Sequence, residues 1–364
     1  MKIGEISKVL SNYAPRAFQE SYDNTGLLVG DSEAECKGVI CCHDLNEKII
    51  EEAISGKCNL IVCHHPPIFS CLKSVLRNSE ESRLIYLCIE KSISIFSTHT
   101  ALDNQLYGGN YTTATKLGLQ NIKILRPSNG NLLKLYSYAP EEHIEAIKTA
   151  IHKAGAGKIG NYSECSFEVK GKGSFKPEEG AEPTLGSIGD VHYEEEVKFE
   201  VILTKDLQSK VLKALFSAHP YEEVAYEMIA LENSNQQIGS GLIGEFSTPL
   251  ETEDFLKLCK NTFKTGIVKH NNSPKSKIKK LAICGGSGSF LLSDAIRAEA
   301  DAFVTGDIGY HRFFDSEGQI LLCDVGHFES ERFVAETIYN FLIKKFPTFA
   351  VHLAETGTNP VNYF

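Results

Sequence analysis

The sequence predicts an α/β protein with a mainly parallel sheet flanked by helices, interrupted by an inserted α+β domain. Short apolar, β-rich runs alternate with amphipathic stretches of helical period in the first and last thirds of the chain. Between them the expected order is strand–helix–strand–strand–helix–strand, which is typical of a ferredoxin-like unit. Polar turns at residues 127–130 and 232–241 separate the two patterns. We therefore expect one discontinuous domain at residues 1–127 and 241–364, and an insert at residues 128–240.

The outer domain begins with the segment MKIGEISKVL, which is expected to form an amphipathic helix. A second amphipathic helix is expected at Glu47–Ile54. Because helical stretches separate the apolar runs, neighbouring strands are expected to be parallel. These strands are predicted at Gly38–Cys42, Leu60–Cys63, Ile93–Phe96, Lys280–Cys284, Ala302–Thr305 and Ile320–Asp324, and a long final helix follows.

The insert is expected to contain two helices and four strands. One helix begins after Pro140, with Glu141 and Glu142 in its first turn, where acidic groups complement the helix dipole. The other helix is expected at Leu207–Ala218. The strands are predicted at Leu132–Tyr138, Ser166–Lys170, Val197–Leu203 and Val224–Leu231.

Composition and charge exclude several classes of protein. A net charge of −10 argues against broad electrostatic binding to nucleic acid or to an anionic membrane. No run of about 18 apolar residues predicts a membrane span, and the N-terminus does not resemble a secretory signal. The 11 cysteines show no C-x-x-C spacing, and several lie in apolar runs. Reduced thiols in a cytoplasmic protein are therefore expected.

Two adjacent histidines, His64 and His65, follow an expected strand directly and precede Pro66 and Pro67. Because proline cannot continue a central strand, the pair lies at the carboxyl end, where open α/β sheets bind their ligands. Neighbouring side chains of an extended chain point to opposite sides. The pair therefore suits two metal ions, or one ion and another partner.

Three acidic or imidazole side chains follow other strands. Asp103 comes after the strand at 93–96, and His327 comes after the strand at 320–324. Glu331 lies four residues beyond His327, so that both occupy one helical face.

The same helical face continues through Val334, Ile338 and Phe341, and its period directs it toward the core. A carboxylate directed at a core must be paired, protonated or metal-bound. The alternative for His327 and Glu331 is a simple pair at a helix start, where Glu favours the dipole. Five His, Asp and Glu side chains at strand ends favour a metal site, and ligands without thiolate suit Zn, Fe(II), Mn or Co.

Three further side chains are candidates for acid–base chemistry. His99 is either a group that supports the site or a loop histidine bonded to backbone. Asp307 and His311 follow the strand at 302–305 and form a candidate acid–base pair beside a metal-bound water, the alternative for Asp307 being a helix cap.

The loop Gly286-Ser287-Gly288 connects a strand to a helix, so its backbone N–H groups are candidates for holding a phosphate. It lacks the lysine of a P-loop and a full G-x-G-x-x-G pattern, and a tight turn explains it as well.

At these residues the chain resembles the GTP cyclohydrolase 1 type 2 homologs, also called NIF-three-like proteins, over almost its whole length. The matching segments are DNTGLLVG (23–30), HHPPIF (64–69), THTALDN (98–104), CGGSGSF (284–290), TGDIGYH (305–311) and GHFESE (326–331). The insert segments GAGKIGNYSECSF and HPYEEVAYE match as well. Tyr22 departs from the family, which often has tryptophan there.

The resemblance implies two divalent metal ions (Zn, Fe or Mn) held by His64, His65, Asp103, His327 and Glu331, with Glu331 bridging. It also implies a ring-shaped homohexamer and an insert similar to PII and CutA-type signalling domains.

Two functions follow as hypotheses. The first is a metal-dependent hydrolase that acts on a nucleotide or another phosphorylated small molecule through metal-activated water, with His99 or Asp307 moving protons. The family name implies attack on the guanine ring of GTP. The alternative is a metal-dependent regulatory or binding scaffold whose PII-like insert senses a small ligand.

Overall fold

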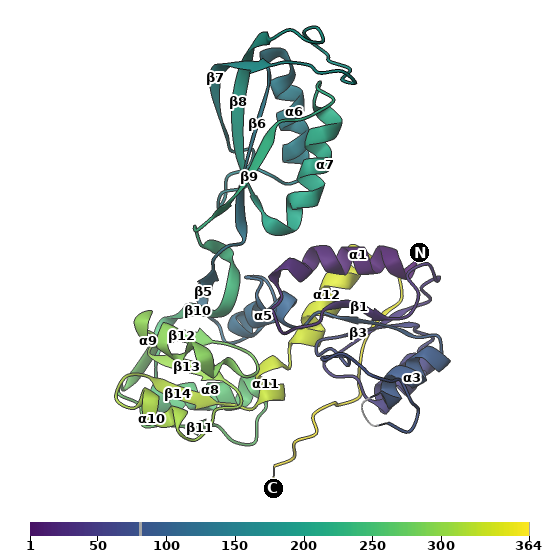
Figure 1. The fold of residues 1–364 in the computed structure, drawn as a ribbon. Helices are drawn as coiled ribbons and strands as arrows, with labels where there is room; N and C mark the ends of the chain where they lie inside the picture. The colour runs from purple at the N-terminus through teal and green to yellow at the C-terminus, as the bar shows by residue number, and fades with distance from the viewer. Residues whose placement is uncertain (80–81, 364) are drawn as a thin grey trace. The chain divides into compact units, whose positions relative to one another are not determined.

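The computed structural model describes residues 1–79 and 82–363 and divides the chain into two compact units (Figure 1). The larger unit comprises residues 1–127 and 237–364, and the smaller unit comprises residues 128–236. The smaller unit is therefore an insertion into the sequence of the larger one.

The first sheet of the larger unit has the strand order β1-β4-β3-β2-β15. Its three central strands and β15 are parallel, whereas β1 pairs with β4 in the antiparallel sense. The three predicted strands are confirmed to within one residue at each end. The strands are β1 (Gly26–Val29), β2 (Val39–Cys42), β3 (Leu60–Cys63), β4 (Ser94–Ser97) and β15 (Val351–Leu353).

Helices cover this sheet through apolar stripes. The predicted first helix forms and buries Ile3, Ile6 and Leu10, and the second begins at the cap Asn46, whose side chain accepts from the Ile49 N–H at 2.9 Å. The helices and short 3-10 turns of the first part are α1 (Ile3–Tyr13), Arg16–Phe18, α2 (Glu47–Ser55), α3 (Arg83–Glu90), α4 (His99–Asp103) and α5 (Gly109–Lys116).

The remaining strands of the larger unit form a second sheet, in the order β11-β14-β13-β12-β10-β5. Only β12, β13 and β14 are parallel to one another, and β10 and β11 flank them in the antiparallel sense. The strands are β5 (Gln120–Ser128), β10 (Asn235–Glu251), β11 (Lys269–His270), β12 (Lys277–Ile283), β13 (Ala302–Thr305) and β14 (Leu321–Asp324). The α/β class is confirmed, with the strands divided between two sheets.

Two expectations for residues 232–364 are corrected. The predicted turn at 232–241 contains the start of β10, which pairs with neighbouring strands despite its polar residues and has positive φ at Gly239 and Gly241.

The predicted long final helix is broken in two near Arg332. Its parts are α11 (His327–Glu331) and α12 (Val334–Lys345), and the other helices here are α8 (Thr252–Phe263), the 3-10 turn Gly288–Leu291, α9 (Leu292–Arg297) and α10 (Arg312–Ser316).

The insert has an antiparallel sheet in the order β7-β8-β6-β9, with α6 and α7 packed over one buried core. This order and the βαββαβ sequence of elements define the predicted ferredoxin-like unit. Its elements are β6 (Leu132–Pro140), α6 (Glu141–Lys153), β7 (Ser166–Phe175), β8 (His192–Thr204), the 3-10 turn Lys205–Leu207, α7 (Gln208–Ala218) and β9 (Tyr226–Leu231).

Two further expectations can be compared with the structure. All 11 cysteines are free thiols. Among the described residues, no helix is both long and apolar enough to cross a membrane.

The buried apolar face of α12 leads to a prediction about stability. Ile338 is 0% exposed in the core that α12 shares with α1 and the first sheet. Replacing Ile338 with Ala should therefore lower the free energy of unfolding of the larger unit by about 2–5 kcal/mol. Urea denaturation measures this change. Asn340→Ala, at an exposed position of the same helix, should change stability by less than about 0.5 kcal/mol. Equal losses in the two variants would contradict this packing.

Candidate metal centre

The carboxyl ends of strands from both sheets supply a cluster of histidines and carboxylates. His64 and His65 directly follow β3, and Asp103 is the last residue of α4, the short helix after β4. His327 and Glu331 are the first and last residues of α11, which follows β14. Local sequence fixes these positions, because Pro66 and Pro67 end the extended run after β3.

The Glu331 carboxylate is the centre of this cluster and is only 6% exposed. Its Oε2 lies 3.2 Å from the Nε2 atoms of both His65 and His327. Its Oε1 faces His64, whose Nε2 lies 3.8 Å away. The two oxygens of one carboxylate thus face two different sets of side chains.

The first set is incomplete without a further partner. His64 is 0% exposed, and neither of its ring nitrogens has a hydrogen-bond partner among the described residues. Its Nε2 faces the Asp103 Oδ2 at 3.4 Å, beyond the usual length of a charged hydrogen bond. A buried polar group without a partner costs about 1–3 kcal/mol, so this arrangement calls for a group between His64, Asp103 and Glu331.

The second set consists of His65, His327 and the Glu331 Oε2, and its two imidazole rings face each other. The Nε2 atoms of His65 and His327 lie 3.4 Å apart. The Nδ1 of His65 lies 2.6 Å from an Asp44 oxygen, and the Nδ1 of His327 lies 2.6 Å from an Asp307 oxygen. A ring whose Nδ1 donates to a carboxylate presents the Nε2 lone pair, as metal-binding histidines do.

These distances fit divalent ions. Ligand atoms about 2.0–2.2 Å from one ion lie roughly 3.0–3.5 Å from each other. The separations between Glu331, His65 and His327 are 3.2–3.4 Å. In the first set, His64 lies 3.4 Å from Asp103 and 3.8 Å from Glu331. Nitrogen and carboxylate donors suit Zn, Fe(II) or Mn. Both sets therefore have the chemistry of metal ligands, and the second set also has their spacing.

The charges in the cluster support one another. Burial alone would raise the pKa of Glu331, but hydrogen bonds from His327 and His43, with the rings of His64 and His65 close by, hold it well below its usual value. The hydrogen bond to Glu331 is the main cause that raises the pKa of His327 to about 9, and Asp307 adds to it. Burial would lower the pKa of His64, but Asp103 and Glu331 raise it. Without a bound cation, protons would neutralise the site.

His43 and Asp44 belong to the site although the sequence analysis did not select them. His43 follows β2, and its Nε2 lies 3.0 Å from Glu331 while its Nδ1 lies 2.5 Å from Asp44. Asp44 also holds His65. The signal was present, because His43 follows the strand at 38–42 just as His64 follows the strand at 60–63. A single histidine at a strand end carries less information than a pair.

His99 lies at the edge of the cluster, where its ring packs against those of His64 and His65 at centroid distances of 5.4 and 5.3 Å. Its Nδ1 lies 2.7 Å from Asp23, a carboxylate that the sequence analysis did not name as a site residue. Burial would raise the pKa of Asp23, but hydrogen bonds from His99 and Thr100 outweigh it and lower it. The φ of His99 is +25°, an uncommon conformation that often marks functional sites.

Two N–H groups of the loop Gly286-Ser287-Gly288, the expected phosphate cradle, have partners within the protein. The N–H of Gly286 donates to Ser330 at 2.9 Å, and the N–H of Gly288 donates to Thr305 at 2.9 Å. Both donors are therefore engaged within the protein. A Cβ on Gly286 would lie 2.3 Å from the Glu331 Oε1, so this glycine allows the carboxylate to approach the backbone.

Asp307 and His311 are separated in the structure. Asp307 holds His327 and accepts a hydrogen bond from the Ser287 hydroxyl at 2.7 Å, so it positions a candidate ligand. His311 is exposed, and its ring packs on Tyr310 and Phe314. Among the described residues, His311 has no hydrogen bond or ion pair with Asp307, and its role in acid–base chemistry stays a prediction.

A cavity of about 400 Å³ adjoins the cluster. His43, His65 and His327 line one part of it, and apolar side chains of the C-terminal segment, Pro360 and Val361, line another. The cluster is therefore accessible to a small molecule.

Mixed sheets with a buried histidine–carboxylate cluster at their strand ends define an α/β protein built around a candidate metal site. The chain belongs to the Duf34/NIF3 (NGG1p interacting factor 3) family, whose pattern matches residues 1–360. It is 34% identical to the GTP cyclohydrolase 1 type 2 homolog of Bacillus subtilis, over 99% of this chain and 98% of that protein. The homolog of Halalkalibacterium halodurans is 36% identical, over 84% of this chain and 82% of that protein.

A solved structure is similar in fold over the whole chain. The Bacillus cereus protein related to NIF3 matches with a TM-score of 0.88 and 31% sequence identity, over 100% of this chain and 99% of that one. The expected family and fold are thus confirmed.

Gly286 generates a prediction about the cluster. The added methyl group in Gly286→Ala would displace the Glu331 carboxylate and should weaken metal binding by roughly 10–100-fold. Gly318→Ala is the matched control, because Gly318 also has a positive φ (+70°, against +62° for Gly286) but open space around its Cα. Metal affinity is measured by competition with a chromophoric chelator. Equal affinities in the two variants would contradict this role of Gly286.

The raised pKa of His327 generates a second prediction. Below a pKa of about 9 the ion-free imidazole holds a proton that a metal ion must displace. Metal affinity should therefore fall with falling pH, by about tenfold per pH unit for each proton released. Asp307→Asn removes one of the carboxylates that raise this pKa, so the decline should begin at lower pH. The same titration over about pH 6–9 measures it, with the exposed Asp315→Asn as control. Identical pH profiles for Asp307→Asn and the unaltered protein would count against the coupling.

Proposed function

We propose that the cluster holds two divalent metal ions and that the protein is a metal-dependent hydrolase. His64, Asp103 and the Glu331 Oε1 would hold one ion, while His65, His327 and the Glu331 Oε2 would hold the other. Glu331 would thus contribute one oxygen to each ion. The observation that carries the proposal is the fully buried His64 ring, which lacks partners for both nitrogens and faces two carboxylates.

Ions bound in this way supply Lewis-acid activation of water and stabilise charge that develops on the substrate. The chain's own residues prepare the site for that chemistry. Asp44 and Asp307 fix the orientation of His65 and His327 through hydrogen bonds of 2.6 Å. Their carboxylates keep the Nε2 atoms directed at the cluster, so little reorganisation is needed when substrate binds.

We assign proton transfer to His99. Its Nδ1 is held by Asp23 at 2.7 Å, which leaves Nε2 to exchange a proton, and its side chain is 17% exposed. The Asp23 carboxylate stabilises the imidazolium that forms when His99 takes up a proton. Asp307 is less suited to this role, because the same oxygen already accepts from Ser287 and His327.

We propose a phosphorylated or nucleotide-like small molecule as the substrate. The cavity beside the cluster has apolar side chains for an organic moiety and about 400 Å³ of space. The name of the Bacillus subtilis relative, GTP cyclohydrolase 1 type 2 homolog, supports nucleotides as the first compounds to test.

One observation favours a regulatory function as the second candidate. The insert contains its own cavity of about 400 Å³, lined by Tyr138, Phe175, Tyr221 and Glu196 among others. A ligand that binds there would make the insert a sensor, with or without turnover in the larger unit.

The test combines metal content with turnover. Glu331→Gln should lose at least one ion per chain and reduce hydrolysis of nucleotides and phosphate esters by at least about 100-fold. His99→Gln should retain both ions and lower kcat by about 10²–10⁴-fold. Glu253→Gln, at an exposed position of α8, is the charge-matched control for Glu331→Gln.

Metal analysis and a substrate panel measure both effects. Full activity of Glu331→Gln would overturn the hydrolase proposal. A nucleotide that raises Tm without any turnover in the unaltered protein would favour the regulatory function.

A further inference from the structure

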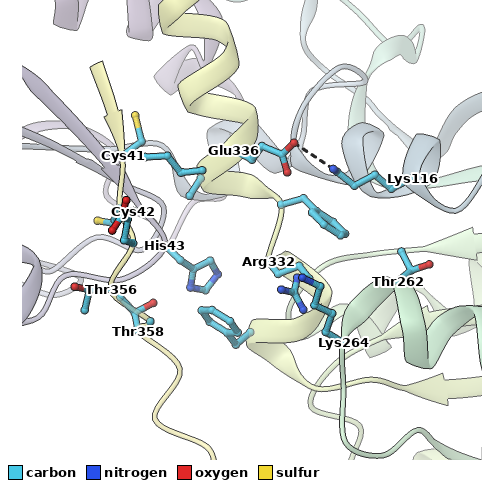
Figure 2. Close-up of a pocket in the computed structure, with 17 residues that line it drawn as sticks. Cys41, Cys42, His43, Lys116, Thr262, Lys264, Arg332, Glu336, Thr356 and Thr358 are labelled. Atoms are coloured by element: carbon cyan, nitrogen blue, oxygen red, sulfur yellow. Dashed lines mark hydrogen bonds and ion pairs between the residues drawn. The ribbon is translucent and has the colours of Figure 1, made fainter. Parts of the chain in front are cut away.

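A larger cavity, of about 640 Å³, lies where α5, α8 and the link between α11 and α12 meet the C-terminal segment (Figure 2). His43 and Phe328 line this cavity and also the cavity beside the cluster. The two spaces therefore share a wall, and a ligand in the larger one lies next to a residue that contacts Glu331.

Two cationic side chains in this cavity form no ion pair among the described residues. The Arg332 side chain comes from the α11–α12 link, and Lys264 caps the end of α8 (Figure 2). Within the described part of the chain, neither has a carboxylate oxygen within 4.0 Å, whereas Lys116 in the same cavity pairs with Glu336 at 3.1 Å. Only one nitrogen of the Arg332 guanidinium has a hydrogen bond among these residues, to the Phe263 carbonyl at 2.5 Å.

The position of this pair is unusual in a chain of net charge −10. Among the described residues, the acidic ones that line the cavity are Glu336, which is already paired, and Glu355, and Glu329 acts on Arg332 from outside the lining. Thr262, a residue with a hydroxyl group, also lines the cavity. Two cations beside a concave space are the chemistry that recognises a phosphate dianion.

We propose that this cavity binds the phosphate group of a small phosphorylated ligand through Arg332 and Lys264. The guanidinium offers a planar fork to two phosphate oxygens, and the Lys264 ammonium adds a second charge. The rest of the ligand would lie against His43, in the wall between this cavity and the cavity beside the cluster. This part of the proposal rests on the proposed function. Phosphate binding itself needs no metal ion.

The proposed phosphate site lies apart from the glycine loop. The N–H groups of Gly286 and Gly288 donate to side chains of the protein. The cationic cavity provides the charge that this loop lacks.

The test uses the full chain after chelation and dialysis, so that no ion can hold the probe. Pyrophosphate is titrated calorimetrically into the unaltered protein, Arg332→Gln, Lys264→Asn and Lys257→Gln. Lys264→Asn removes the charge while asparagine tolerates the left-handed conformation of this residue (φ +49°), so the fold is preserved. Lys257→Gln removes an equal charge from an exposed position of the same helix.

We expect Lys264→Asn and Arg332→Gln each to weaken pyrophosphate binding at least tenfold, and Lys257→Gln to leave it unchanged. The affinities of the variants for a nucleoside triphosphate should follow the same order. If the nucleoside triphosphate binds more tightly than pyrophosphate, the site accepts a phosphate ester. Succinate, a dianion of two carboxylates, should bind at least tenfold more weakly than pyrophosphate.

Three results would overturn the proposal: no pyrophosphate binding, unchanged binding in Lys264→Asn, or equal binding of succinate. None of them depends on a bound metal ion, because pyrophosphate is titrated after chelation, whereas the hydrolase proposal is tested on metal-loaded protein. Failure of the phosphate site and failure of the metal-dependent hydrolase are therefore distinguishable.

Discussion

The buried carboxylate of Glu331 is the constraint around which the larger unit is organised. A carboxylate that is 6% exposed must be neutralised by its surroundings, because burying an unpaired charge costs far more than one packing contact returns. Imidazoles from the ends of β2, β3 and β14 provide that neutralisation. The two sheets thus meet at their carboxyl ends around one charged group, and the cluster connects them as well as providing the site.

Other parts of the unit maintain this arrangement. Asp44 and Asp307 hold the rings of His65 and His327 from behind, and Gly286 leaves the space into which Glu331 extends. The break between α11 and α12 lets the short helix present Glu331 to the cluster while Ile338 remains in the core of the first sheet. The same break places Arg332 in the cationic cavity next to His43. The proposed metal ligand Glu331, the proposed phosphate ligand Arg332 and the core residue Ile338 therefore lie in one short stretch of sequence.

Much of the fold could be predicted because its signals are local. The apolar runs before His64 and His327 are buried strands, and the βαββαβ order of the insert follows from the sequence of its elements. Edge strands were missed, since β1 is only partly buried and β15 has three residues. The division into two sheets was also missed, because hydrophobic period shows which residues are buried but not which strands pair.

The sequence by itself determined the candidate ligands, since a histidine pair before two prolines and a His-x-x-x-Glu helix start keep their chemistry wherever the chain folds. Only the tertiary structure decided how they combine. It directed each oxygen of Glu331 to a different set of side chains and brought His43 and Asp44 into the cluster. It also engaged two N–H groups of the glycine loop and left Arg332 and Lys264 without an ion pair among the described residues. The physical reason is that pairing and desolvation depend on distances between atoms, and side chains hundreds of residues apart acquire those distances only when the chain folds.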